Sequence, residues 1–254
     1  METKTILIIS AVAIIFLLES VFPHYRGRAT RVRHGAPHII TAILNSLLTK
    51  FALVLLTLWA INWAESRSFG LLHVLSLPPI AETVIVYVLF DIWMYFWHMA
   101  NHRFSFFWLF HRAHHSDTEM DTTTALRFHP GELVLSTLFR LPVVILLGMS
   151  FAQLVFFEVM LNLSTLFHHS NLAVPEKFDR ALRTVIVTPN MHRVHHSIEM
   201  NETNSNFTSL LSVWDRIFGT FRTRKDTHTI TLGLPEFREL KYQRLWGFLI
   251  TPIK

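Results

Sequence analysis

Three groups of closely spaced histidines constrain this chain more than any other feature of its sequence. Of the 16 histidines, 11 lie between His98 and His196, and eight of these form the boxes His98-Met-Ala-Asn-His102, His111-Arg-Ala-His114-His115 and His192-Arg-Val-His195-His196. Residues three and four apart lie on one face of an α-helix, so the imidazoles of one box can converge. Three such boxes in a chain without cysteine predict that these side chains bind metal.

The number of histidines favours two metal ions, because a single zinc takes only three or four ligands. Two further histidines are candidate ligands: His129, in Arg127-Phe128-His129-Pro130, and His169, which follows His168. Five histidines are expected at the surface or at a membrane interface: His24, His34, His38, His73 and His228.

Histidines that bind metal usually donate their second ring nitrogen to a carboxylate or a carbonyl. Asp91 precedes His98 by seven residues and shares its helix face, so we expect Asp91 to be such a partner. Asn171, just after His169, is a second candidate partner. Three other carboxylates are weaker candidates and are expected to be solvated: Glu132, Asp117 and Glu199.

The composition indicates a membrane protein. Hydrophobic residues make up 51% of the 254 residues and charged residues only 16%, whereas a soluble protein usually carries about 25% charged residues. The missing cysteines exclude disulfides, thiolate zinc sites and iron–sulfur clusters. The formal charge of +5 lies largely beside apolar segments, which does not predict nucleic-acid binding.

Five apolar runs predict membrane helices, at about 5–22, 39–64, 80–97, 133–149 and 151–167. The first has no basic start and no small-residue cleavage site, so we interpret it as a retained anchor. Arg140 and Glu158 interrupt the last two runs, which we interpret as a hairpin that need not cross the full bilayer.

The segment from His24 to Arg33 predicts the orientation of these helices. It contains four arginines between the first two runs, and the positive-inside rule places it in the cytoplasm. Counting the runs from there brings all three boxes to the cytoplasmic face. The expected fold is therefore an all-α membrane bundle of about four to five helices with a histidine-rich cytosolic cap.

A metal centre at the ends of apolar helices is well placed for a substrate that enters from the lipid. Two metals bound by imidazoles can reduce dioxygen and oxidise an unactivated C–H bond, which side-chain acids and bases cannot do. A zinc-dependent membrane hydrolase is the alternative, although the chain has no His-Glu-x-x-His motif. A metal transporter is a third reading, but it would need histidines near the middle of the membrane.

The motifs taken together resemble the fatty acid hydroxylase/sterol desaturase superfamily of membrane di-iron oxidases. The similarity extends beyond the boxes to a set of neighbouring residues: Asp91, Tyr95, Trp97, Thr124 to Pro130, Phe167 to Asn171, Val187 to Pro189, Asn204 to Phe207 and Trp214 to Thr220. The resemblance covers about residues 84–236, which we assign as the catalytic domain. Residues 1–83 are assigned as N-terminal membrane spans and residues 237–254 as a C-terminal tail.

The resemblance implies that two iron ions are bound by the eight box histidines, and that no catalytic residues are needed beyond the metal ligands. His169 occupies the position of the superfamily's intermediate histidine, His168 is an extra one, and the pattern also supports His129. The implied reaction is an oxygen-dependent hydroxylation or desaturation of a sterol-like or acyl or alkyl lipid. Electrons would come from a separate protein. A bacterial inner membrane is favoured over the endoplasmic reticulum, and the sequence does not select the lipid.

Overall fold

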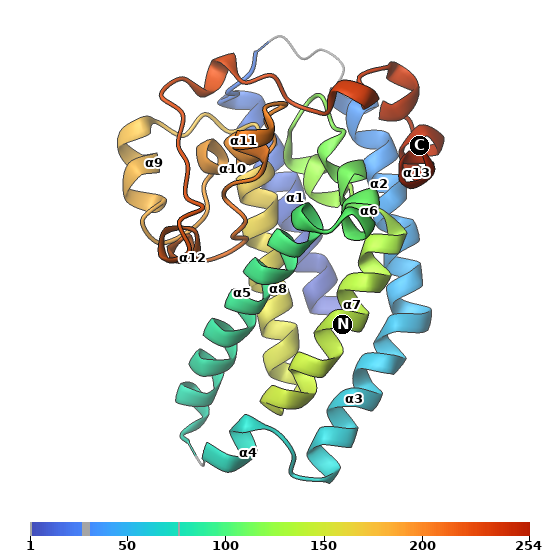
Figure 1. Ribbon diagram of the computed structural model, residues 1–254, viewed down its shortest axis with the longest axis vertical. Coiled ribbons are helices and arrows are strands. Elements are labelled where there is room, and N and C mark those ends of the chain that lie inside the picture. The colour runs from blue at the N-terminus through green and yellow to red at the C-terminus, as the bar shows by residue number, and fades with distance from the viewer. Residues whose placement is uncertain (1, 27–30, 76) are drawn as a thin grey trace.

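A computed structural model describes residues 2–26, 31–75 and 77–254, and helices dominate this part of the chain (Figure 1). No strand occurs among the described residues, which contain only isolated bridges such as Ile186 with Leu211. Long helices form a bundle, and short helices and loops form a cap at one end of it. The long helices are α1 (Glu2–Val21), α2 (Arg31–Leu48), α3 (Val54–Ser66), α5 (Pro79–Arg103), α7 (Pro130–Leu147) and α8 (Phe151–His169).

The shorter elements connect the bundle or build the cap. A π-helical turn, η1 (Thr49–Leu53), joins α2 to α3, and α4 (Leu71–Leu75) lies at the far end of the bundle. The α-helices of the cap are α6 (Ser105–His115), α9 (Glu176–Leu182), α10 (Pro189–His195), α11 (Met200–Thr203), α12 (Val213–Ile217) and α13 (Leu245–Leu249). The 3-10 helices are η2 (Thr122–Leu126), η3 (Thr227–Thr229), η4 (Pro235–Phe237), η5 (Leu240–Gln243) and η6 (Thr251–Ile253).

Five helical segments of the described chain are long and apolar enough to cross a membrane, as the sequence predicted: 4–21, 31–75, 79–103, 130–147 and 151–169. Their outward surfaces are apolar. In α1, for example, Ile9 and Leu17 are exposed, whereas the side chain of Glu19 is fully buried. A surface helix in water shows the opposite pattern, so the medium around the bundle is lipid and the chain is an integral membrane protein.

The α7–α8 pair is a hairpin with well-defined ends. Pro130 occupies the first turn of α7, where its missing N–H costs nothing, and Gly148 ends the helix in the left-handed region with φ of 70°. At 18 and 19 residues, the two helices are about 27 and 28 Å long. The expected hairpin is therefore present, and it is not shallow, because each helix has nearly the length of the hydrocarbon core.

The arginine-rich connection between α1 and α2 is described only in part. Residues 27–30, including Arg28, lie outside the described residues. Arg31 begins α2 and forms an ion pair with the buried carboxylate of Glu19. The side of the membrane on which this connection lies stays a prediction.

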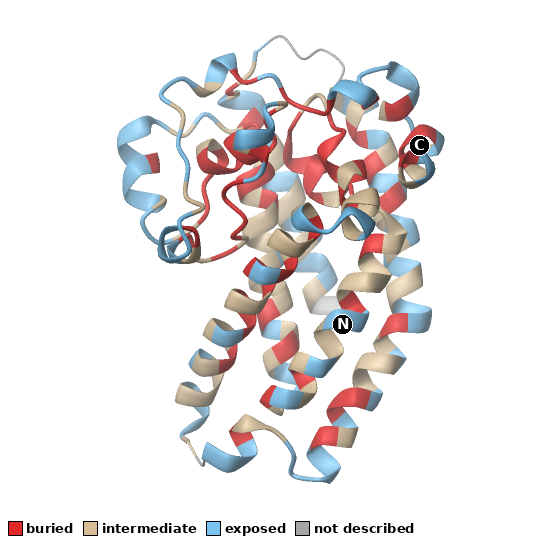
Figure 2. Cartoon of the chain, in the orientation of Figure 1, coloured by how far each residue is buried: buried red, intermediate tan, exposed pale blue. Residues whose placement is uncertain are grey.

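The main apolar core joins α5, α7 and α8, with Phe90, Trp97, Val144 and Phe157 among its buried members. Figure 2 shows that buried residues are most concentrated above this core, where the bundle meets the cap. The C-terminal residues pack against α6, as bonds from Arg112 to the Thr251 carbonyl (2.7 Å) and from Gln243 to the Ser116 carbonyl (2.9 Å) show.

Candidate metal centre

Nine histidines from four helices meet where the bundle joins the cap. The ends of α5, α6, α8 and α10 supply them, and their nitrogens form two compact groups. The five-histidine group contains His98, His102, His111, His115 and His195, and the four-histidine group contains His114, His169, His192 and His196. Within each group, the candidate ligand atoms lie within 4.8 Å of one another.

Local sequence explains how the helices deliver these side chains. α5 ends at Arg103, and α6 begins two residues later in a new direction, so the first two boxes face each other across a sharp bend. The hydroxyl of Thr188 caps α10, whose first residue is Pro189, and this start fixes the third box. The boxes thus lie on helix ends rather than in mid-helix.

In the five-histidine group, the Nε2 atom of His98 lies 3.1 Å from Nε2 of His111 and 3.1 Å from Nε2 of His195. The other ring nitrogen of each of these three histidines has an acceptor. Nδ1 of His98 donates to the Phe207 carbonyl at 2.7 Å, and Nδ1 of His195 donates to the Ser205 carbonyl at 2.6 Å. Nδ1 of His111 lies 2.8 Å from a carboxylate oxygen of Glu132.

The four-histidine group is built in the same way. Nε2 of His169 lies 3.0 Å from Nε2 of His114 and 3.0 Å from Nε2 of His192. Nδ1 of His169 donates to the Thr165 carbonyl at 2.8 Å, and Nδ1 of His114 donates to the Arg127 carbonyl at 3.3 Å.

These contacts fix the tautomers and leave lone pairs pointing inward. A neutral imidazole has one N–H donor and one acceptor nitrogen, so a ring whose Nδ1–H binds a carbonyl has its lone pair on Nε2. Lone pairs that face one another repel unless a cation lies between them. Two nitrogens bound about 2.1 Å from one ion at about 90° would be about 3.0 Å apart, which matches the observed spacing.

Burial favours the neutral form of several of these imidazoles and leaves some ring nitrogens without a protein partner. Burial lowers the pKa of His195 to about 3 and lowers the pKa of His114 and His196 well below the usual range, and neighbouring histidines add to the effect at all three. Both ring nitrogens of His102 and His196 are buried without a hydrogen-bond partner. A set of neutral imidazoles suits iron, zinc, copper or nickel, so the side chains present fit metal ions at both groups.

The carboxylate that bonds a histidine of these two groups is Glu132, which the sequence ranked below Asp91. Glu132 comes from the first turn of α7 and is buried beside His111. Asp91 instead accepts bonds from the Trp214 indole (2.7 Å) and the Leu211 amide (3.2 Å). Asn171 bonds both main-chain groups of Tyr25. Asp91 and Asn171 therefore hold neighbouring segments together, and among the described residues neither side chain bonds to a histidine ring.

The structure does not bring His129 into either group. Its Nδ1 accepts from the Gly131 amide at 3.0 Å and caps α7, and its Nε2 donates to the Leu249 carbonyl at 3.1 Å. His168 lies closer, with its ring 4.1 Å from that of His192, but it belongs to neither group.

A third group, His34 with His38 and Asp117, was not foreseen, because His34 and His38 were expected at the surface. His38 is only 1% exposed, and His34 is nearly buried between two carboxylates. Nε2 of His34 lies 2.8 Å from Asp117, and its Nδ1 lies 3.0 Å from Asp121. His24 is also buried, whereas His73 and His228 are exposed as expected.

This His34 group has the residue types of a metal site but a different arrangement. Both nitrogens of His34 donate to carboxylates, so neither has a lone pair to offer. His38 lies between the Thr123 hydroxyl and the Arg127 guanidinium, each at 3.0 Å. We interpret the His34 group as an ion-pair network that ties α2 to the segment after α6.

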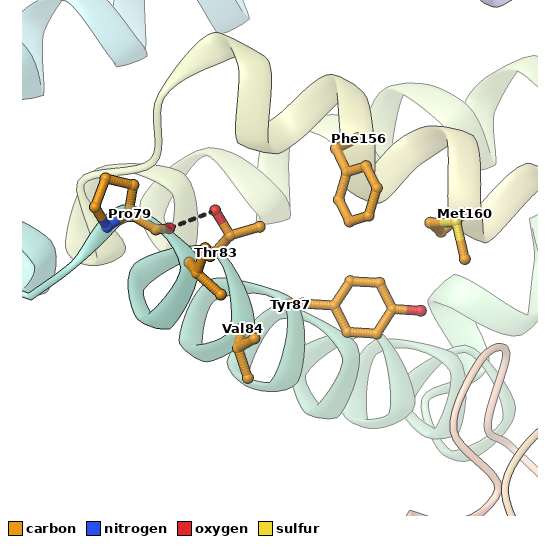
Figure 3. Close-up of a pocket in the computed structure, with 7 residues that line it drawn as sticks. Pro79, Thr83, Val84, Tyr87, Phe156 and Met160 are labelled. Carbon is orange, nitrogen blue, oxygen red and sulfur yellow. Dashed lines mark hydrogen bonds between the residues drawn. The ribbon is translucent and has the colours of Figure 1, made fainter.

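An apolar groove of about 500 Å³ lies between α5 and α8, toward the end of α5 away from the histidines. Figure 3 shows the ring of Tyr87 facing Phe156 and Met160 across it, with Pro79, Thr83 and Val84 along α5. Tyr87 precedes His98 by 11 residues, or about 16 Å along the helix. Of the residues that the structure describes, no histidine lines the groove, which therefore lies apart from the two histidine groups.

Comparison with known proteins places this site in a family. The fatty acid hydroxylase family matches residues 83–220, which include every box, so the chain belongs to that family. Alkylglycerol monooxygenase from Danio rerio is 30% identical over 166 residues, or 61% of this chain and 35% of that protein. The human alkylglycerol monooxygenase is 27% identical over 162 residues, covering 60% and 34%.

A bacterial relative is named for a different lipid. An ornithine lipid hydroxylase from Rhizobium tropici is 26% identical over 161 residues, or 62% of this chain and 46% of that protein. The matched part thus spans about a third to a half of the length of these relatives. No solved structure matches the chain significantly.

Proposed function

We propose that this chain is an oxygen-dependent lipid hydroxylase whose nine clustered histidines hold two iron ions. The observation that carries the proposal is the pair of neutral imidazole groups, with lone pairs facing inward, at the ends of apolar helices. Family membership supports the same conclusion. In this proposal the metal ligands are the five-histidine and four-histidine groups defined above.

The protein's own task is to hold these imidazoles in one tautomer and one orientation. The Phe207, Ser205 and Thr165 carbonyls do this for His98, His195 and His169, and Glu132 does it for His111. When bound, the two iron ions supply the redox chemistry by which dioxygen, two electrons and two protons convert a C–H bond into C–OH and water.

Hydroxylation is favoured over desaturation because the matched relatives are named as monooxygenases or hydroxylases. The substrates in their names, alkylglycerols and an ornithine lipid, are both lipids, which suits a centre at the ends of membrane helices. We infer that a membrane lipid is the substrate and that a separate electron-transfer protein supplies the electrons. The arginines between α1 and α2 support a cytoplasmic active site, and a bacterial inner membrane stays our favoured location.

Labelled dioxygen tests this proposal. Membranes from a host that expresses the wild-type chain would be incubated under ¹⁸O₂ with reductant, and their lipids analysed by mass spectrometry. We expect a lipid that gains one labelled oxygen atom with the wild-type chain and with His73→Ala, an exposed histidine outside both groups, but not with His196→Ala. In a parallel incubation without oxygen in H₂¹⁸O, a cleaved lipid that carries the label would instead support the zinc hydrolase.

A further inference from the structure

Two short helices of the cap, α9 and α12, have their polar and apolar faces reversed. On α9, Phe178 and Leu182 are four residues apart and are 64% and 40% exposed, whereas Asp179 between them is fully buried. On α12, Val213 and Ile217 are four residues apart and exposed, whereas Asp215 is fully buried. A cap helix in water would show the opposite arrangement, so these outward faces suit an apolar medium.

Hydrogen bonds and an ion pair hold the two buried aspartates in place, so specific contacts maintain the reversed faces. Asp215 accepts bonds from the Phe207 and Thr208 amides at 2.8 and 3.1 Å and from the Thr208 and Thr220 hydroxyls at 2.7 Å each. Asp179 forms an ion pair with Arg183. Rotating either helix to expose its aspartate would break these contacts, so the apolar side chains are held outward.

The two helices form one unit. The Ser212 amide donates to the Val185 carbonyl at 3.0 Å, and the Ser212 hydroxyl donates to the Arg183 carbonyl at 2.7 Å. Their exposed apolar side chains therefore form a single set, which we call the α9–α12 patch: Phe178, Leu182, Val185, Val213, Ile217 and Phe218. Both helices lie on the outer side of the cap, and α12 forms its lower edge beside the upper part of α5 (Figures 1 and 2).

The patch is continuous with the lipid-facing surface of the bundle. The ring of Phe218 lies 5.0 Å from that of Phe96, which is 37% exposed on the membrane helix α5, and stacks 5.2 Å from Tyr95. Three exposed cations, Lys177, Arg180 and Arg216, flank the patch, and the exposed acid beside them is Glu176. Apolar side chains bordered by cations match the boundary between acyl chains and lipid phosphates.

We propose that the α9–α12 patch rests in the headgroup boundary of the bilayer as a second membrane contact, in addition to the membrane-spanning helices. This contact fixes the height of the cap above the lipid. Phe96 precedes His98 by two residues, or about 3 Å along α5. A cap anchored at Phe218 therefore holds the five-histidine group at the level where hydrocarbon gives way to headgroups.

Environment-sensitive labelling tests this contact without any measurement of activity. Because the chain has no cysteine, a single introduced cysteine would carry the only label. Ile217→Cys and Val213→Cys would report on the patch, and Lys225→Cys, at an exposed position of the cap away from it, is the matched control. Each variant would be labelled with the fluorophore NBD and placed in phosphatidylcholine nanodiscs, with or without lipids that carry a nitroxide near the top of the acyl chain.

We expect blue-shifted emission and quenching by the nitroxide lipids at positions 217 and 213, and water-like, unquenched emission at 225. Emission at 217 and 213 that matches 225 would overturn the proposal. A blue shift that nitroxide lipids do not quench would also overturn it, because the patch would then be covered by protein. The result does not depend on bound metal, so it stands or fails separately from the proposed hydroxylase activity.

Discussion

Two sets of buried histidines lie close together in this protein and are used in opposite ways. In the two proposed ligand groups, a carbonyl accepts the Nδ1–H of His98, His195 and His169, and the lone pair on Nε2 faces other imidazoles. In the His34 group, carboxylates bind both nitrogens of His34, which requires the protonated ring. The acceptor on the second nitrogen therefore decides whether a buried histidine can bind metal or acts as a cation.

The largest effect is expected when a metal-facing imidazole is removed. His195→Ala or His196→Ala should reduce hydroxylation by more than about 100-fold, beyond the 10–100-fold loss typical of outer partners. Oxygen incorporation into lipid is the measurement, and His228→Ala, an exposed histidine, is the control. Wild-type activity in both variants would show that these nitrogens do not serve the reaction.

A smaller loss is expected at the partner of a ligand. Glu132→Ala removes the acceptor 2.8 Å from Nδ1 of His111 and should lower metal affinity or activity by about 10–100-fold. Glu132→Gln keeps an acceptor oxygen and should lose less. Metal titration of both variants would check the order, and equal losses would mean that this hydrogen bond does not orient His111.

The His34 group should affect stability rather than metal content. His34→Ala leaves Asp117 and Asp121 buried without their cation, and breaking a buried ion pair typically costs about 3–5 kcal/mol. Denaturant unfolding in detergent should show a loss of this size, while the folded fraction keeps its full metal content. A variant that stays as stable as the wild type but loses one metal ion would place a ligand in the His34 group.

Lowering the pH should change the stability contributions of the two histidine sets over different pH ranges. Burial lowers the pKa of His195 to about 3, against about 6.5 in an unfolded chain. The unfolded chain therefore binds a proton that the folded metal-free chain does not, and stability present above about pH 6.5 is lost as the pH falls toward 3. Burial would raise the pKa of Asp121, but its bond to His34 holds it below the usual value. The contribution of Asp121 to folding stability is thus retained until the pH falls below about 3.9.

Unfolding of the metal-free chain between pH 6 and 5 measures this difference. His195→Ala should reduce the slope of unfolding free energy against pH by up to about 1.4 kcal/mol per pH unit. Asp121→Asn should leave the slope unchanged in this range, whatever its effect on absolute stability. Identical slopes in the wild type and in His195→Ala would contradict the assignment of His195 as a neutral buried imidazole.

Most members of the two histidine groups could be predicted from the sequence, because helical spacing is local information. The i, i+3 and i+4 positions indicated the eight box histidines, and apolar run lengths indicated the membrane helices. The hydrogen-bond acceptors of the histidine rings were less predictable, because the Phe207 and Ser205 carbonyls lie in a loop whose conformation sets their direction. Glu132 lies 21 residues from His111 in the chain, so only the folded turn between α6 and α7 brings them together.

For several other residues, the local sequence indicated a role different from the predicted one. His34 and His38 are four residues apart, as are Asp117 and Asp121, and this pairing could have indicated a buried network between two turns. Asp91 shares a helix face with His98, but its carboxylate accepts a hydrogen bond from the indole of Trp214, on α12 of the cap. His129 precedes Pro130 and Gly131, a sequence typical of a helix start, and it caps α7.

Metal stoichiometry of the purified wild-type protein, measured by elemental analysis with Mössbauer spectroscopy of iron-57, tests the central claim most directly. If the lone pairs of the two histidine groups bind metal and the His34 group does not, the chain will carry two iron ions in similar imidazole-rich environments. The same count is expected for His34→Ala in its folded fraction. A third ion per chain that is lost in His34→Ala, or a folded protein that binds none, would contradict the account.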